Sequence, residues 1–178
     1  VYVFGDFNNW QRTEIRMQRD RHGVWSAFFP EAMYRDRLRH GSLYKLHVHG
    51  DNGWKDRIPA YATRVVQDEA TKNYTAQFWA PEPFDWQGDA FDASKNGSLM
   101  IYEAHVGMAQ EKEGVGTYRE FTEKILPIIK KDGYNAVQLM AIAEHPYYGS
   151  FGYHVSSFFA PASRCGTPEE LKELVRRA

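Results

Sequence analysis

Two tryptophans and a lysine have the residue types and surroundings of a small sugar-binding platform. Trp10 ends the turn-rich run 6–10, Trp54 directly follows the turn 51–53, and Lys45 lies on the polar face of the strand expected before that turn. Indole rings stack on the apolar faces of sugars, and an ammonium group donates hydrogen bonds to their hydroxyls. Tryptophan at strand ends more often completes a small core, and the residue types alone favour that alternative.

A second group of rings lies in the run 144–154, whose sequence is EHPYYGSFGYH. Tyr153 and His154 follow a glycine, so the backbone can fold tightly there and project both side chains into a cleft. In that arrangement Tyr153 stacks under a sugar and His154 hydrogen-bonds it, although spacing alone leaves the odds for Tyr153 about even. The alternative, in which rings pack the loop onto its own domain, is favoured for Tyr147, Tyr148 and Phe151.

Other groups with chemical potential lack the partners that their chemistry needs. Glycosidic chemistry uses paired carboxylates, but nothing in the spacing of Glu103 and Glu144 establishes such a pair, and neither is assigned as catalytic. His47 and His49 share a strand face without a third metal ligand at a recognisable spacing, which favours a solvated face. Cys165, just before a helix N-terminus, is expected to have a lowered thiol pKa, yet no motif supplies a base, and packing is favoured.

Composition is that of an ordinary globular protein of 178 residues, with 43% apolar and 25% charged residues. A formal net charge of −1 argues against nucleic acid as a partner. No apolar run approaches the ~18 residues of a membrane span, and a single cysteine excludes an internal disulfide framework. We expect a reducing cytoplasmic compartment, and the strand-like start at Val1 predicts that the chain is a fragment.

The first half of the chain has the pattern of a β-sandwich. Short β-type runs separated by turn residues are typical of that fold. The run 43–49 alternates between one packed and one polar face, and the sequence DNG at 51–53 predicts a hairpin turn. The expected strands cover residues 1–4, 24–30, 43–49, 63–66 and 74–78.

The second half alternates between strands and helices. Strands are expected at 99–106 and 136–140, and a helix between them begins with a capping box at Thr117 and ends at Gly133. Pro127 lies inside this helix, where it should kink or loosen the middle turns. A second helix begins at Thr167, and this order implies parallel strand pairing.

A long loop at 141–166 exceeds the ~12–15 residues at which structureless loops become unusual, so we expect it to be functional. Little periodicity between Asp85 and Gly97 marks a linker. The predicted domains are therefore a sandwich at 1–84, a linker at 85–97 and an α/β part at 98–178. Two βα units cannot close a barrel, and their exposed edges predict contacts with a missing remainder or with another chain.

Four motifs in this order resemble the 1,4-alpha-glucan (glycogen) branching enzymes of the alpha-amylase superfamily. They are GDFNNW at 5–10, YKLHV at 44–48, IYEAHVGM at 101–108, and the run from YNAVQLM at 134 through GTPEEL at 166–171. The resemblance implies a multi-domain β plus α/β chain. An immunoglobulin-like β-sandwich of the carbohydrate-binding module 48 type would precede the first βα units of an incomplete (β/α)8 barrel.

The resemblance also implies a function and site residues. Branching enzymes cleave α-1,4-glucan and transfer the segment to a 6-hydroxyl, retaining configuration through a covalent glycosyl-enzyme and using no cofactor. Tyr153 matches the ring that stacks under the sugar at the cleavage point, while Trp10, Lys45 and Trp54 match glucan-binding positions of related modules. His154 stands where relatives commonly have glutamine.

The resemblance places the family's catalytic carboxylates after Ala178, so we expect the 178 residues alone to be inactive and at most glucan-binding. Two other functions stay open. One is a non-catalytic glycogen-binding protein, against which the barrel-like second half argues. The other is a debranching enzyme or another hydrolase of the superfamily. The sequence AEHPYYGSFGY at 143–153, followed by SSFFAP at 156–161, favours the branching type over this alternative.

Overall fold

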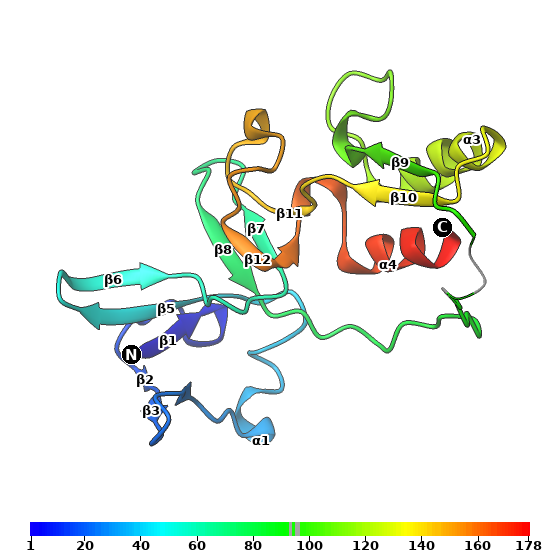
Figure 1. The fold of residues 1–178 in the computed structure, drawn as a ribbon. Coiled ribbons are helices and arrows are strands. Elements are labelled where there is room, and N and C mark those ends of the chain that lie inside the picture. The colour runs from blue at the N-terminus through cyan, green and yellow to red at the C-terminus, as the bar shows by residue number, and fades with distance from the viewer. Residues whose placement is uncertain (93, 95–96) are drawn as a thin grey trace. The chain divides into compact units, whose positions relative to one another are not determined.

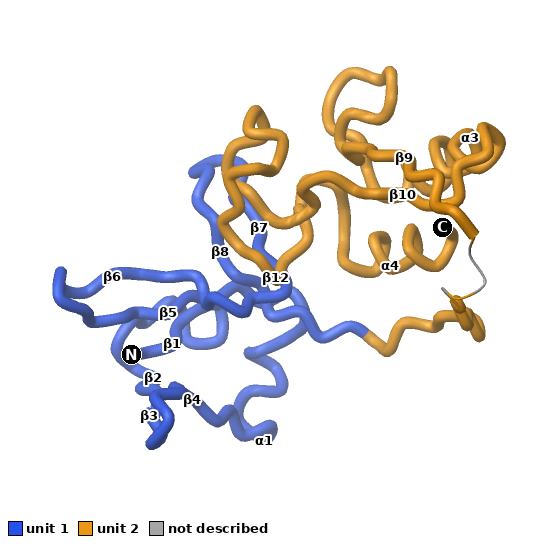
Figure 2. Tube along the Cα trace, viewed as in Figure 1, with its two compact units in different colours: residues 1–81 blue, residues 82–178 orange. Residues whose placement is uncertain are grey.

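The computed structural model describes residues 1–92, 94 and 97–178, which form two compact units, Val1–Pro81 and Glu82–Ala178 (Figure 2). The predicted ranges 1–84, 85–97 and 98–178 stay predictions, and residues 93, 95 and 96 of the linker lie outside the described residues. None of the described helices is both long enough and apolar enough to cross a membrane.

The first unit is built on one antiparallel sheet with the strand order β2-β1-β5-β8-β7, in which β6 pairs with β5 (Figure 1). A separate two-stranded sheet joins β3 to β4. The elements are β1 (Tyr2–Gly5), η1 (Asp6–Asn8), β2 (Ile15–Arg16), β3 (Gln18–Arg19), β4 (Trp25–Ser26), α1 (Glu31–Tyr34), β5 (Leu43–Gly50), β6 (Gly53–Arg57), β7 (Val65–Gln67) and β8 (Tyr74–Gln77).

Each expected strand of the first half overlaps a strand of the structure, but two details differ. The run expected at 24–30 forms only the two residues of β4, because Pro30 precedes the short helix α1 and Phe28 is left exposed. The predicted turn at 51–53 joins β5 to β6, with Gly53 at φ 81°. The chain needs a glycine there because other residues are strained at positive φ.

The second unit contains the predicted parallel strand pair. β9 (Ile101–Ala104) pairs with β10 (Ala136–Leu139) in parallel, joined by η3 (Val106–Met108), α2 (Tyr118–Glu120), η4 (Phe121–Ile125) and α3 (Leu126–Lys131). After them come β11 (Ala143–Glu144), η5 (Tyr148–Ser150), β12 (Ser157–Pro161), η6 (Ser163–Cys165) and α4 (Pro168–Arg177). Figure 1 shows β9 and β10 side by side, between α3 and α4.

The core of the second unit lies between this strand pair and its helices. Tyr118, Phe121 and Leu174 are almost completely buried, and they pack with Ala104 at the end of β9. The tyrosine hydroxyl at 118 donates a hydrogen bond to the carbonyl of Ala162 (3.2 Å), so its buried polar atom is satisfied.

Pro127 has the predicted loosening effect on the connecting helix. The segment immediately before it, η4, is a π-helical turn, and Pro127 itself lies in the first turn of α3, where its missing N–H costs least. Gly133 ends the helix as expected, at φ 91°. The amides of Gly133 and Tyr134 bond back to the carbonyls of Lys130 (3.1 Å) and Ile129 (3.3 Å), which is a Schellman C-cap.

The expectation of one long loop at 141–166 is wrong. This region contains the antiparallel pair β11–β12, with a register shift between Ala143 and Glu144. The strands escape sequence reasoning because β11 has only two residues and β12 lacks an alternating pattern. The chain between them, from 145 to 156, contains the short helix η5 and is otherwise irregular.

We predict that the N-cap of α4 contributes measurably to stability. Thr167 Oγ1 accepts the Glu170 amide (3.2 Å), and Glu170 Oε2 accepts the Thr167 amide (2.9 Å). Thr167→Ala should lower the free energy of unfolding by about 1 kcal/mol, measured by urea denaturation. Thr167→Ser, which keeps the oxygen, is the matched control, and equal midpoints for the two variants would contradict the prediction.

Candidate functional site

The hydrogen bonds of the turn GDFNNW at 5–10, called the corner below, explain the spacing of its residues. Gly5, at the end of β1, lies so close to β5 that a Cβ would be 2.1 Å from the Leu43 carbonyl oxygen. Asp6 uses both carboxylate oxygens, accepting the Leu43 amide on Oδ2 (2.7 Å) and the Trp10 indole N–H on Oδ1 (3.0 Å). Asn8 is buried and accepts the Gly5 amide (3.0 Å). The hydrogen bonds of the corner thus fix the position of Trp10.

Trp10 itself lies partly exposed above the sheet. Its backbone and that of Asn9 are in the left-handed region, at φ 60° and 52°. Its ring packs edge-on against the buried Phe4 at 5.6 Å and leaves 36% of its surface exposed. The ring therefore has apolar area available to a ligand.

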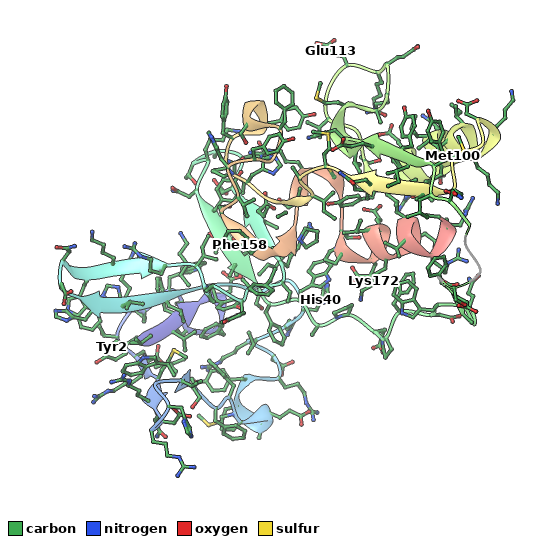
Figure 3. The ribbon with its side chains drawn as sticks, in the orientation of Figure 1. Tyr2, His40, Met100, Glu113, Phe158 and Lys172 are labelled. Atoms are coloured by element: carbon green, nitrogen blue, oxygen red, sulfur yellow. The ribbon has the colours of Figure 1, made fainter. Side chains whose placement is uncertain are left out.

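Trp54 lies on the β5–β6 hairpin. Its ring stacks flat on His47, with centroids 4.6 Å apart and planes 9° from parallel, and it contacts Tyr2 of β1 at 5.8 Å. Tyr2, labelled in Figure 3, marks this part of the sheet. Trp54 is 48% exposed.

The structure places the three predicted platform residues on one face of the sheet. Phe4 lies opposite Lys45 in the β1–β5 register and 6.2 Å from the His47 ring, so it connects the surroundings of Trp10 to those of Trp54. Lys45 emerges on the same side as His47, two residues along β5. We call this surface the aromatic face, made of Tyr2, Phe4, Trp10, Lys45, His47 and Trp54.

An ionic network supports the aromatic face, and sequence reasoning missed it. His47 Nδ1 lies 2.8 Å from Asp56 Oδ1, and Arg12 donates to Asp56 Oδ2 from Nη2 (2.9 Å) and Nε (3.1 Å). The Arg12 guanidinium also lies over the Phe4 ring, 5.3 Å from its centroid. The expectation of a solvated strand face is therefore wrong for His47, whose side chain is only 14% exposed.

Asp56 titrates below its usual range because of these partners. Burial alone raises its pKa, but the hydrogen bonds and charges of Arg12 and His47 outweigh that effect and lower the pKa from 3.8. The hairpin turn at 51–53 sets a register that pairs Asp56 with His47. That register was the available signal for this contact.

The second predicted surface is the loop that carries Tyr153. Phe151 and Gly152 are both left-handed, at φ 54° and 86°. A Cβ on Gly152 would lie 2.3 Å from the Ala141 carbonyl oxygen, so glycine is required there. Tyr153 is 69% exposed. His154 is exposed beside it, and its amide lies 3.4 Å from Ser150 Oγ.

The neighbouring rings follow the packing interpretation only in part. The hydroxyl of Tyr148 donates to the Gly107 carbonyl (3.0 Å), and Phe151 packs edge-on against His105 at 6.2 Å. Tyr147 differs from expectation, because 64% of its surface is exposed.

Glu144 and Glu103 have structural partners. Glu144 is completely buried and accepts the amides of Ser163 (2.7 Å) and His145 (3.2 Å). Glu103 accepts a hydrogen bond from the Gln138 side-chain amide (3.3 Å). Neither contact resembles a positioned acid and nucleophile.

Cys165 corrects one expectation. Burial, reinforced by the negative charge of Glu144, raises the pKa of its thiol to about 11. The predicted lowering fails because the sulfur lies in the core, where a thiolate would be poorly solvated, although the helix α4 begins only three residues later. The packing interpretation of Cys165 is confirmed.

Comparison with known proteins points to carbohydrate enzymes. Residues 1–62 match the family model of carbohydrate-binding module 48 (isoamylase N-terminal domain). The chain is 48% identical to the 1,4-alpha-glucan-branching enzyme of Yarrowia lipolytica, an alignment covering 98% of the chain and 26% of that enzyme. Identity to the Dictyostelium discoideum enzyme is 44%, over 100% of the chain and 26% of the enzyme. The chain spans about a quarter of the length of these curated relatives.

Solved structures share the fold at low sequence identity. The glycogen-degrading pneumococcal virulence factor SpuA, in a product complex, superposes with a TM-score of 0.75 at 18% identity, covering 99% of this chain and 23% of that one. The Group B Streptococcus pullulanase SAP gives 0.72 at 19% identity, covering 98% and 28%. With the family-model match, this likeness identifies the β-rich first unit as a β-sandwich.

We predict that acid weakens the sheet through Asp56. Because its pKa is lowered on folding, the carboxylate contributes stability that is fully present above about pH 4 and is lost as pH falls through the lowered folded pKa. Asp56→Asn removes this contribution. Thermal unfolding from pH 7 to pH 2 should show the wild type above the variant at neutral pH and the two converging in acid. A constant gap across this range would contradict the prediction.

Proposed function

We propose that the chain belongs to the 1,4-alpha-glucan-branching enzyme family, and that the protein carrying it makes α-1,6 branches in glycogen. The reaction cleaves an α-1,4-glucan and transfers the released segment to a glucan 6-hydroxyl. It retains configuration through a covalent glycosyl-enzyme intermediate. The observation that carries the proposal is 48% identity to a branching enzyme across 98% of the chain.

We propose that the second unit is the beginning of a (β/α)8 barrel. Its support is the parallel pairing of β9 with β10 through a helical crossover, followed by the helix α4. Barrel enzymes place their sites on the loops that follow the strands. Tyr153 comes after β10, as that architecture requires of a substrate-binding residue.

Tyr153 is the residue of this unit that we assign to substrate. A ring that is 69% exposed and follows a left-handed glycine offers a flat apolar surface to a glucose unit. His154 is exposed next to it and can exchange hydrogen bonds with sugar hydroxyls.

The aromatic face of the first unit is the proposed second glucan contact. Trp10 and Trp54 supply exposed indole surfaces, and Lys45 on the same face supplies a donor. The contacts among Arg12, His47 and Asp56, and the stacking of His47 on Trp54, support this face in the absence of a ligand. A preformed surface loses little conformational entropy on binding.

We infer that the 178 residues bind glucan but do not catalyse transfer by themselves. A retaining mechanism uses two carboxylates about 5–5.5 Å apart, one of which must attack the sugar. Glu144 is sealed in the core, and Glu103 is bonded to Gln138, so neither of these strand-end groups is free for that task.

The alternatives have less support. A purely glucan-binding protein does not account for the parallel β9–β10 unit. A debranching enzyme would share the front module, but identities of 44% and 48% are to branching enzymes.

We predict that Trp10→Ala and Trp54→Ala each weaken glycogen binding by about tenfold, equivalent to about 1.4 kcal/mol of lost contact. Affinity electrophoresis or calorimetry with glycogen measures the change. Trp25→Ala is the matched control, because Trp25 is 40% exposed in the same unit but belongs to the separate β3–β4 sheet. If Trp25→Ala weakened binding as much as the other two, the assignment of the aromatic face would be wrong.

For the activity, we predict that a full-length enzyme carrying these residues lowers the iodine absorbance of amylose and produces new α-1,6 linkages. Tyr153→Ala should reduce kcat/KM at least tenfold, about 1.4 kcal/mol of transition-state stabilisation. The 178 residues alone should bind glycogen and form no branches. Reducing ends that rise without new branches would show hydrolysis and overturn the proposed function.

A further inference from the structure

Three of the contacts that attach the loop displaying Tyr153 to the rest of the second unit lie along its length. Arg164 donates to the carbonyls of His145 (2.7 Å) and Pro146 (2.9 Å) at its start. The hydroxyl of Tyr148 donates to the carbonyl of Gly107 (3.0 Å) in its middle. The third attachment, at Phe151, lies closest to Tyr153.

His105 makes this third attachment from the end of β9. Its Nε2 lies 3.2 Å from the Phe151 carbonyl oxygen, and its ring packs edge-on against Tyr148 (6.1 Å) and Phe151 (6.2 Å). A carbonyl oxygen only accepts, so Nε2 must carry the proton. Nδ1 is buried and has no hydrogen-bond partner among the described residues.

The peptide that His105 holds is the one whose orientation decides where Tyr153 points. It joins Phe151 to Gly152, and both have left-handed backbones, at φ 54° and 86°. A non-glycine residue in this conformation is strained and persists only where its surroundings hold it. Gly152 lies against Ala141, and the Phe151 carbonyl of the same peptide bonds to His105, so contacts at both residues restrain the peptide.

We propose that His105 is a positioning residue for Tyr153. By donating Nε2–H to the Phe151 carbonyl, it stabilises the strained peptide and thereby the direction in which the Tyr153 ring meets a glucose unit. His105 itself does not contact substrate. This inference rests on the proposed function, in which Tyr153 binds glucan.

Three substitutions separate the hydrogen bond from the bulk of the ring. His105→Gln can place its side-chain N–H close to the position of Nε2 and should preserve the bond. His105→Phe keeps the ring and removes the donor. His105→Asn carries a donor that ends near the position of Nδ1, too short to reach Phe151, and it serves if the phenylalanine variant does not fold.

The kinetic test is a double-mutant cycle in a full-length branching enzyme carrying these residues, with amylose as substrate. We expect His105→Phe to lower kcat/KM by about five- to tenfold and His105→Gln to stay within about twofold of the wild type. In a Tyr153→Ala background, His105→Phe should have no further effect. An undiminished loss in that background, or equal losses for His105→Phe and His105→Gln, would overturn the inference.

A second readout does not depend on activity. Hydrogen exchange of the 178-residue chain, followed over peptides covering 147–155, reports whether the loop opens. The Tyr153 amide bonds to the Ser150 carbonyl (3.0 Å), and it should exchange faster in His105→Phe and at the wild-type rate in His105→Gln. Unchanged exchange in His105→Phe counts against the inference alone, whereas absence of branching by the wild-type enzyme counts against the proposed function alone.

Discussion

Left-handed backbone beneath exposed rings is the constraint on which both candidate surfaces depend. Trp10 has φ 60°, and Phe151, two residues before Tyr153, has φ 54°. The region is unfavourable for side chains with a Cβ because the Cβ approaches the following carbonyl. At both places a polar side chain from the same unit bonds nearby, Asp6 to the Trp10 indole and His105 to the Phe151 carbonyl.

Both candidate surfaces are supported by hydrogen bonds from a polar side chain. At Trp10 the side chain is Asp6, which accepts the indole N–H on one oxygen and the Leu43 amide of the neighbouring strand on the other. At Phe151 it is His105, which bonds to the backbone carbonyl from the end of β9. The rings of Trp10 and Tyr153 are exposed, while the side chains that support them, Asp6 and His105, are hydrogen-bonded. A flat ligand would therefore meet a surface that needs little reorganisation.

Several side chains of types that often take part in catalysis have structural roles in this protein. Glu144 is a buried acceptor of two amides, and the nearby Cys165 has a pKa raised by burial and by that carboxylate. His47 stacks on Trp54 and contacts Asp56, so it supports the aromatic face instead of facing solvent. These side chains lie where a reactive group is plausible from sequence, and their surroundings make them structural.

The sequence by itself determined the features that depend on near neighbours in the chain: the hairpin turn at 51–53, the capping boxes at Thr117 and Thr167, the stop at Gly133 and the order of strands and helices. It also made Trp10 and Tyr153 candidates, since each lies next to turn residues or a glycine. Tertiary structure alone decided the partners of Asp56, the short β11–β12 pair and the bond from His105 to Phe151. These contacts join residues far apart in the chain, and their energies depend on burial and register, which no local pattern specifies.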